Sequence, residues 1–143
     1  MTLDTFNQAW TADRRTFDWV DASPRFAWPS DHEVAEGDAE RWRGIVDLLL
    51  GWRSDPSRLI AEDIEPPQIA VIDHALRVCD AWRRAPYTPP DRVLPDAEGG
   101  LAFEWYREPW FSDLEFERDG RATWRVYSDS RPIERGHFFW KPQ

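Results

Sequence analysis

Cysteine, lysine and long apolar runs are almost missing from this 143-residue sequence, and each scarcity narrows the class of protein. The single cysteine, Cys79, cannot form an internal disulfide and excludes a cysteine-based zinc cluster, so a reducing, cytoplasmic setting is expected. No basic segment followed by an apolar run opens the chain, so no secretory signal is expected. The longest apolar run, residues 46–50, is interrupted by Asp47 and is far shorter than the ~20 residues of a membrane span, which predicts no membrane partner.

The charge balance is strongly acidic, with 27 acidic against 18 basic residues and a net charge of -9. Lys141 is the one lysine, and this preference for arginine is typical of GC-rich bacterial genomes. A negative field disfavours a nucleic-acid partner, because nonspecific binding depends on neutralising phosphates. It favours a partner protein with a basic surface, or it serves solubility alone.

Tryptophan is the other unusual feature, with ten residues. Aromatic side chains supply apolar area to cores and interfaces alike. A chain of this length forms one domain, residues 1–143, which buries roughly 70% of its unfolded surface. We expect about half of the tryptophans in that core and regard the others as candidates for a contact surface.

Residues 38–85 have helical patterns. Asp38 is a candidate cap for a helix ending near Gly51, while an earlier start at Ser30 is weakened by Gly37. Five apolar residues of this helix follow core-facing spacing: Trp42, Ile45, Val46, Leu49 and Trp52. A short helical turn follows Pro56, and a longer helix spans residues 66–85. The polar half of that longer helix includes His74, which is expected at the surface.

Residues 1–30 give mixed signals. Leu3, Phe6 and Trp10 have helical spacing, residues 16–20 alternate as a strand does, and residues 22–29 suggest an irregular, proline-bounded segment.

From residue 91 to residue 140 the pattern changes to a period of two, which predicts antiparallel strands. A three-residue loop, 118–120, sets Leu114 opposite Trp124. In the preceding hairpin, a four-residue loop, 108–111, sets Trp105 opposite Leu114 and brings Glu104 across from Glu115. Residues 92–95 and 133–140 add edge strands. The fold class is therefore α+β, with two to three helices on one face of a three- to five-stranded antiparallel meander.

The Glu104 and Glu115 pair is the main candidate for chemistry. Two close carboxylates share a proton or bind a cation, and Tyr106 and Tyr127 are expected on the same face. The alternative is an exposed sheet face on which the two glutamates separate in water. The three histidines, His32, His74 and His137, have no metal-binding spacing, and no nucleophile elbow or phosphate loop is present, so no cofactor or metal is expected.

Three aromatic residues are candidates for a binding surface. Trp110 and Phe111 are expected in a hairpin loop, and Trp140 lies in the tail behind two phenylalanines. These side chains either close over the core or anchor an interface.

Residues 66–127 resemble a group of small bacterial proteins without an assigned activity. The resemblance rests on the pattern Pro-x-x-x-Gly-Gly-hydrophobic-x-hydrophobic-Glu-Trp, here residues 95–105, followed by two further strands. It implies a helix followed by a meander and no catalytic residues.

The sequence thus favours a non-catalytic cytoplasmic protein that docks a partner protein through an acidic, aromatic surface, as an inhibitor, immunity protein or antitoxin does. Arg125, Glu104 and Glu115, with Trp110 at the edge, are the expected contacts. The alternative is a small hydrolase or metal-dependent enzyme that uses the two glutamates and a histidine from the tail. Whether the chain forms a homo-oligomer stays open.

Overall fold

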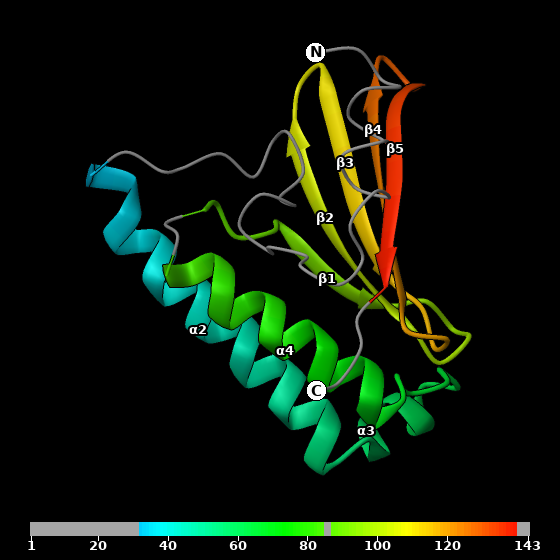
Figure 1. Cartoon of the computed structure of the whole chain (residues 1–143). Coiled ribbons are helices and arrows are strands. Elements are labelled where there is room, and N and C mark those ends of the chain that lie inside the picture. Colours follow the sequence, from blue (N-terminus) through cyan, green and yellow to red (C-terminus); the bar gives the residue numbers. More distant parts are fainter. Residues whose placement is uncertain (1–31, 85–86, 140–143) are drawn as a thin grey trace.

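The computed structural model describes residues 32–84 and 87–139, in which helices come first and strands follow (Figure 1). The elements are α2 (His32–Ser54), α3 (Ser57–Ala61), α4 (Ile69–Arg84), β1 (Arg92–Pro95), β2 (Leu101–Arg107), β3 (Trp110–Phe116), β4 (Arg121–Ser128) and β5 (Arg131–Phe139). The strands form one antiparallel sheet in chain order, so the predicted α+β meander is confirmed. Predictions for residues 1–30 and for Trp140 lie outside the described residues. Within the described ranges, no helix is long and apolar enough to cross a bilayer.

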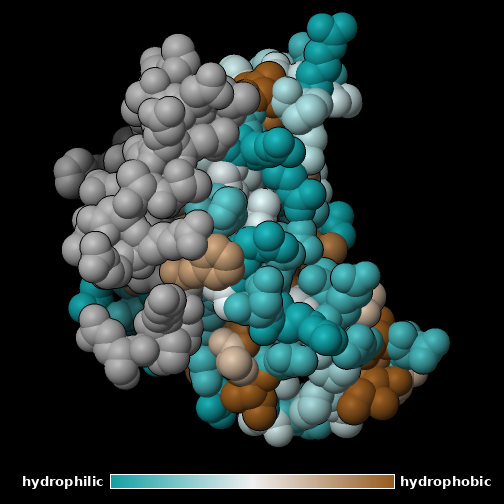
Figure 2. All heavy atoms as spheres, turned by 45° about the vertical axis from the view of Figure 1, so that its right-hand side comes forward, coloured by the Kyte–Doolittle hydropathy of each residue, from teal (hydrophilic) through white to brown (hydrophobic). Residues whose placement is uncertain are grey.

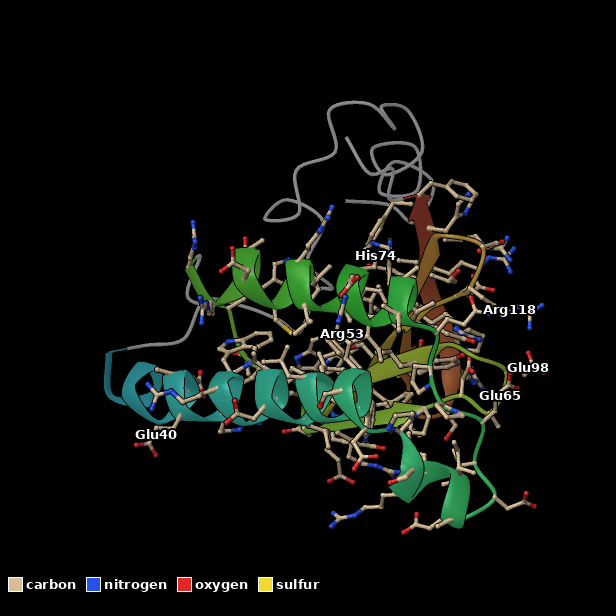
Figure 3. All side chains as sticks on the ribbon, turned by 90° about the horizontal axis from the view of Figure 1, so that it is seen from below. Glu40, Arg53, Glu65, His74, Glu98 and Arg118 are labelled. Atoms are coloured by element: carbon tan, nitrogen blue, oxygen red, sulfur yellow. The ribbon has the colours of Figure 1, made fainter. Side chains whose placement is uncertain are left out.

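The helices form a layer over one face of the sheet. α2 and α4 lie side by side and run in opposite directions (Figures 1 and 3). Most apolar residues of α4 are buried as its periodicity predicts, although Ile69 at its start is 55% exposed. Trp82 packs against Trp105 of β2 with ring centroids 5.9 Å apart. The predicted stripe of α2 also faces this core, where Trp42 and Leu49 are buried.

α2 begins earlier than Asp38, so the predicted cap is wrong. The helix continues through Gly37, although glycine inside a helix costs about 1 kcal/mol. Asp38 is instead a buried residue of the helix that forms an ion pair with Arg41. A helix that packs against α4 gains more from its buried face than one glycine costs.

Each central strand alternates between buried and partly exposed residues, which separates a core face from an outer face. The three-residue loop before Arg121 is confirmed, because Gly120 has a φ of 91° and Leu114 pairs with Trp124. The backbone N–H of Glu117 donates to the carbonyl of Arg121 at 2.8 Å, which closes the hairpin.

The β2–β3 hairpin corrects one predicted register. Its loop is two residues long, Glu108 and Pro109, because the strand continues through Trp110. Trp105 therefore pairs with Ser112, and Leu114 pairs with Phe103. The prediction was wrong by two residues, a shift that leaves every side chain on its expected face because the period of a strand is two.

His74 is buried, contrary to the prediction of a surface position. α4 contacts both α2 and β3, so more than one stripe of its surface is covered. The imidazole of His74 (labelled in Figure 3) packs edge-to-face against two rings, with its centroid 5.1 Å from that of Phe116 and 6.2 Å from that of Phe138. Burial, helped by the charge of Arg77, lowers the pKa of His74 to about 3, so the ring is neutral in the fold.

Candidate functional site

The sheet face that points away from the helices, the open face, carries a row of five charged side chains. This charged row crosses the sheet in the order Arg92, Glu104, Asp113, Arg125 and Arg135. Glu104 and Asp113 are direct neighbours with the same charge, an unfavourable arrangement. An arginine flanks each of them, with Arg92 3.7 Å from Glu104 and Arg125 3.2 Å from Asp113. The flanking arginines, Arg92 and Arg125, therefore offset the repulsion between Glu104 and Asp113.

Asp113 is the titrating member of the charged row. Burial raises its pKa to about 6, Arg125 opposes this rise, and the charges of Glu115 and Glu104 add to it. Arg125 is held between two carboxylates, because its guanidinium donates to both Asp113 and Glu115. The open face therefore has an ion-paired centre in which Asp113 changes its charge near pH 6.

Three aromatic rings lie beside the charged row on the same face. Tyr106, Phe111 and Tyr127 come from neighbouring positions of β2, β3 and β4 and form what we call the aromatic ladder. The Phe111 ring lies 5.0 Å from that of Tyr106 and 5.7 Å from that of Tyr127. Tyr106 is 44% exposed, and its hydroxyl donates to Glu104 at 2.8 Å, a bond that raises the pKa of the phenol. The ladder thus presents aromatic surface outside the core.

The predicted aromatic contacts are divided between the two faces of the sheet. Trp110 and Phe111 belong to β3 and not to a loop, so that prediction is wrong. Trp110 is partly buried against the core cluster on the helix side, whereas Phe111 is the middle ring of the aromatic ladder. The strand extends through both residues because their side chains have packing partners on opposite faces.

The predicted opposition of Glu104 and Glu115 is also wrong. Glu115 lies between Ala102 and Thr123 in the sheet. Glu104 pairs with Asp113 instead, so the two glutamates are offset by two residues along the strands. His137 lies opposite Thr123 and lines the same hollow as Glu115, whereas Glu104 does not line it. Across residues 32–84 and 87–139, no group of three or more potential ligands is placed to hold a metal ion. The structure therefore joins Glu115 with His137 and places Glu104, the other carboxylate named in the enzyme alternative, outside this hollow.

Carboxylates gather where the open face meets the turns at one end of the sheet. Six acidic residues and Arg118 line a hollow there, which we call the acidic hollow; its carboxylates are Glu65, Asp96, Glu98, Glu115, Glu117 and Asp119. Glu65, Glu98 and Arg118 lie together at this end in Figure 3. On the face drawn in Figure 2, hydrophilic residues cover most of the described surface, with smaller hydrophobic patches between them. The sequence identifies these turns, but only the meander brings them together, so sequence reasoning missed the hollow.

Cys79 is buried in α4, on the side of the helix that packs into the core. Burial raises the pKa of its thiol to about 12, which keeps it protonated and unreactive.

Comparison with known proteins identifies no relative. No family model matches the chain, and no curated protein and no solved structure is significantly similar to it.

Proposed function

We propose that this protein is a non-catalytic binding protein that docks a partner protein through the open face of its sheet. The observation that carries the proposal is the aromatic ladder, because three contacting rings project from the face opposite the helices. Large rings with few rotatable bonds lose little entropy on binding and are enriched among residues that dominate interface energy.

The surroundings of the ladder support a contact with a protein. The neighbouring charges of Glu104 and Asp113 are already offset by arginines, so little new pairing is needed when the rings are covered. The open face continues from Phe111 through Asp113 and Glu115 of β3 to Glu117, the residue that follows the strand. At ~3.4 Å per residue this stretch is roughly 20 Å long, which suits the contact of a folded partner or a bound segment.

The acidic hollow at the end of this stretch supports a basic partner. It contains six carboxylates and one arginine, and the exposed Glu65 and Glu98 have no ion pair within the described part of the chain. Opposite charges guide two proteins together and exclude wrong partners. With the net charge of -9, this distribution favours a basic protein over nucleic acid.

A cytoplasmic inhibitor, immunity protein or antitoxin has the properties that this proposal requires. Such a protein is small, presents a preformed acidic surface and needs no catalytic group. The single buried cysteine is compatible with the reducing environment of the cytoplasm.

The experiment compares proteins captured from the native host by the wild-type chain and by three variants. The ladder variant, Y106T/F111T/Y127T, keeps residues that favour strands but removes the rings. The hollow variant, E65Q/E98Q, removes two negative charges at the acidic end. The control, E40Q/D47N, removes the same charge from exposed positions of α2, where Glu40 points away from the acidic hollow (Figure 3).

We expect one protein of basic isoelectric point that the wild type and the E40Q/D47N control retain and the ladder variant loses. The hollow variant should bind it more weakly, with the difference reduced at high salt because charges are screened. Equal retention by the wild type and a folded ladder variant would refute the proposal. So would a wild-type chain that retains no protein or only copies of itself.

A further inference from the structure

A second hollow, the β4–β5 hollow, has an unusual charge distribution. It lies on the open face beside β3, has a volume of about 500 Å³, and is lined by residues that include Arg121, Arg125, Arg135 and His137. Two glutamates complete its charged lining: Glu115 of β3 and Glu117, the residue that follows β3. In a chain with a net charge of -9, this region is locally basic.

The carboxylates on the β3 side of the hollow are already occupied. Glu117 accepts hydrogen bonds from the guanidinium of Arg121 at 2.7 and 3.1 Å and from the hydroxyl of Thr123 at 2.9 Å. Glu115 accepts from Arg125, which is also bound to Asp113. Each glutamate is thus paired with an arginine of β4, and neither is paired with Arg135 of β5.

On the β5 side of the hollow, Arg135 and His137 carry donors that have no acceptor among residues 32–84 and 87–139. Arg135 is exposed, and it forms no ion pair with any residue in the described part of the chain. It lies directly opposite Arg125 across the sheet, and two like charges in this position repel each other. His137, two residues further along β5, lines the same hollow. The centroid of its imidazole lies 5.7 Å from that of the Phe139 ring. An anion placed here would offset the repulsion between the arginines.

We propose that the β4–β5 hollow binds a small molecule through an oxyanion group, a carboxylate or a phosphate, held by Arg135 and His137. A planar guanidinium binds such oxygens through two parallel hydrogen bonds, and the imidazole supplies a further donor. The volume lies within the range of ~300–1,000 Å³ typical of small-molecule sites.

This site does not rest on the proposed docking function, because Arg135 and His137 belong neither to the aromatic ladder nor to the acidic hollow. The two proposals can therefore fail separately.

The test is a titration of the full chain with phenyl phosphate, benzoate and inorganic phosphate, followed by backbone amide NMR shifts and by calorimetry. We expect saturable binding of at least one probe, with shifts concentrated in residues 121–125 and 135–137. R135Q should weaken this binding by about tenfold or more, as expected when one charge-assisted bidentate contact is lost. Comparing the probes identifies the oxyanion and whether an attached ring contributes.

R131Q is the matched control, because Arg131 is exposed on the same strand but outside the hollow. Its dissociation constant should stay within about twofold of the wild-type value at 0.15 M salt, where distant charges are screened. Equal weakening by R131Q and R135Q would show a general charge effect and overturn the assignment. An absence of saturable shifts with all three probes would overturn it as well.

Discussion

Replacing Asp113 by asparagine should stabilise the protein at neutral pH and have almost no effect near pH 4. Burial raises the pKa of Asp113 in the folded state from 3.8 to about 6. The unfolded chain therefore releases this proton first as the pH rises, and the free energy of unfolding falls between about pH 3.8 and pH 6. Asparagine carries no charge at any pH, so D113N avoids this loss.

The magnitude follows from the shift of about two pKa units, from 3.8 to about 6. At 1.36 kcal/mol per unit this equals about 3 kcal/mol, and partial contact of the carboxylate with water reduces the expected effect to about 1–2 kcal/mol. Arg125, Glu115 and Glu104 face Asp113, and their contributions are included in the net shift.

The assay is urea denaturation of wild type and D113N at pH 4, 5, 6 and 7.5, followed by tryptophan fluorescence. The difference between the two proteins is the relevant quantity, because His74 titrates in the opposite sense and cancels from it. D73N provides the control, since Asp73 forms an exposed ion pair with Arg53 at 2.7 Å and such pairs contribute little. A D113N variant that is less stable than wild type at pH 7.5, or a difference that does not vary with pH, would refute the reasoning.

Three further predictions concern the core. G136A should destabilise the fold by about 1–3 kcal/mol, because the added Cβ would lie 2.6 Å from the Trp124 side chain. G44A should stabilise it by about 0.5–1 kcal/mol, because Gly44 lies on the exposed side of α2 with no neighbour within 4 Å. Thermal unfolding measures both changes, and equal effects of the two substitutions would contradict this reasoning. For His74, the folded pKa of about 3 lies below the ordinary value of 6.5, so stability present above pH 6.5 is lost as the pH falls. The wild type should therefore lose about 2 kcal/mol more unfolding free energy than H74L between pH 7 and pH 4.5. An equal loss in both proteins would exclude a buried neutral imidazole. Cys79 should react with a thiol reagent only as fast as the chain unfolds, and rapid labelling of the native protein would show that the thiol is accessible.

The face of each strand was predictable from the sequence, whereas the pairing of strands was predictable only where a turn determined it. Gly120 specifies the β3–β4 loop, and the register with Trp124 followed correctly. The β2–β3 loop has no comparable glycine, and Trp110 and Phe111 suit a strand as well as a loop. The length of this loop, and with it the neighbour of Glu104, depended on tertiary packing.

The site was less predictable than the fold. Tyr106, Phe111 and Tyr127 were all candidates, but their alignment in one ladder follows from the observed register. The burial of His74 depends on how α4 is enclosed, a property that helical periodicity does not contain. The acidic hollow depends in the same way on turns that lie far apart in the sequence.

The contact between Trp82 of α4 and Trp105 of β2 gives the molecule an internal optical reporter. Their ring centroids lie 5.9 Å apart and their planes are inclined by 52°. In such an arrangement the two indole transitions couple and give a couplet, two circular-dichroism bands of opposite sign. The couplet exists only while the helical layer rests on the sheet. Circular dichroism in the indole bands can therefore follow the docking of these two layers separately from the formation of either one.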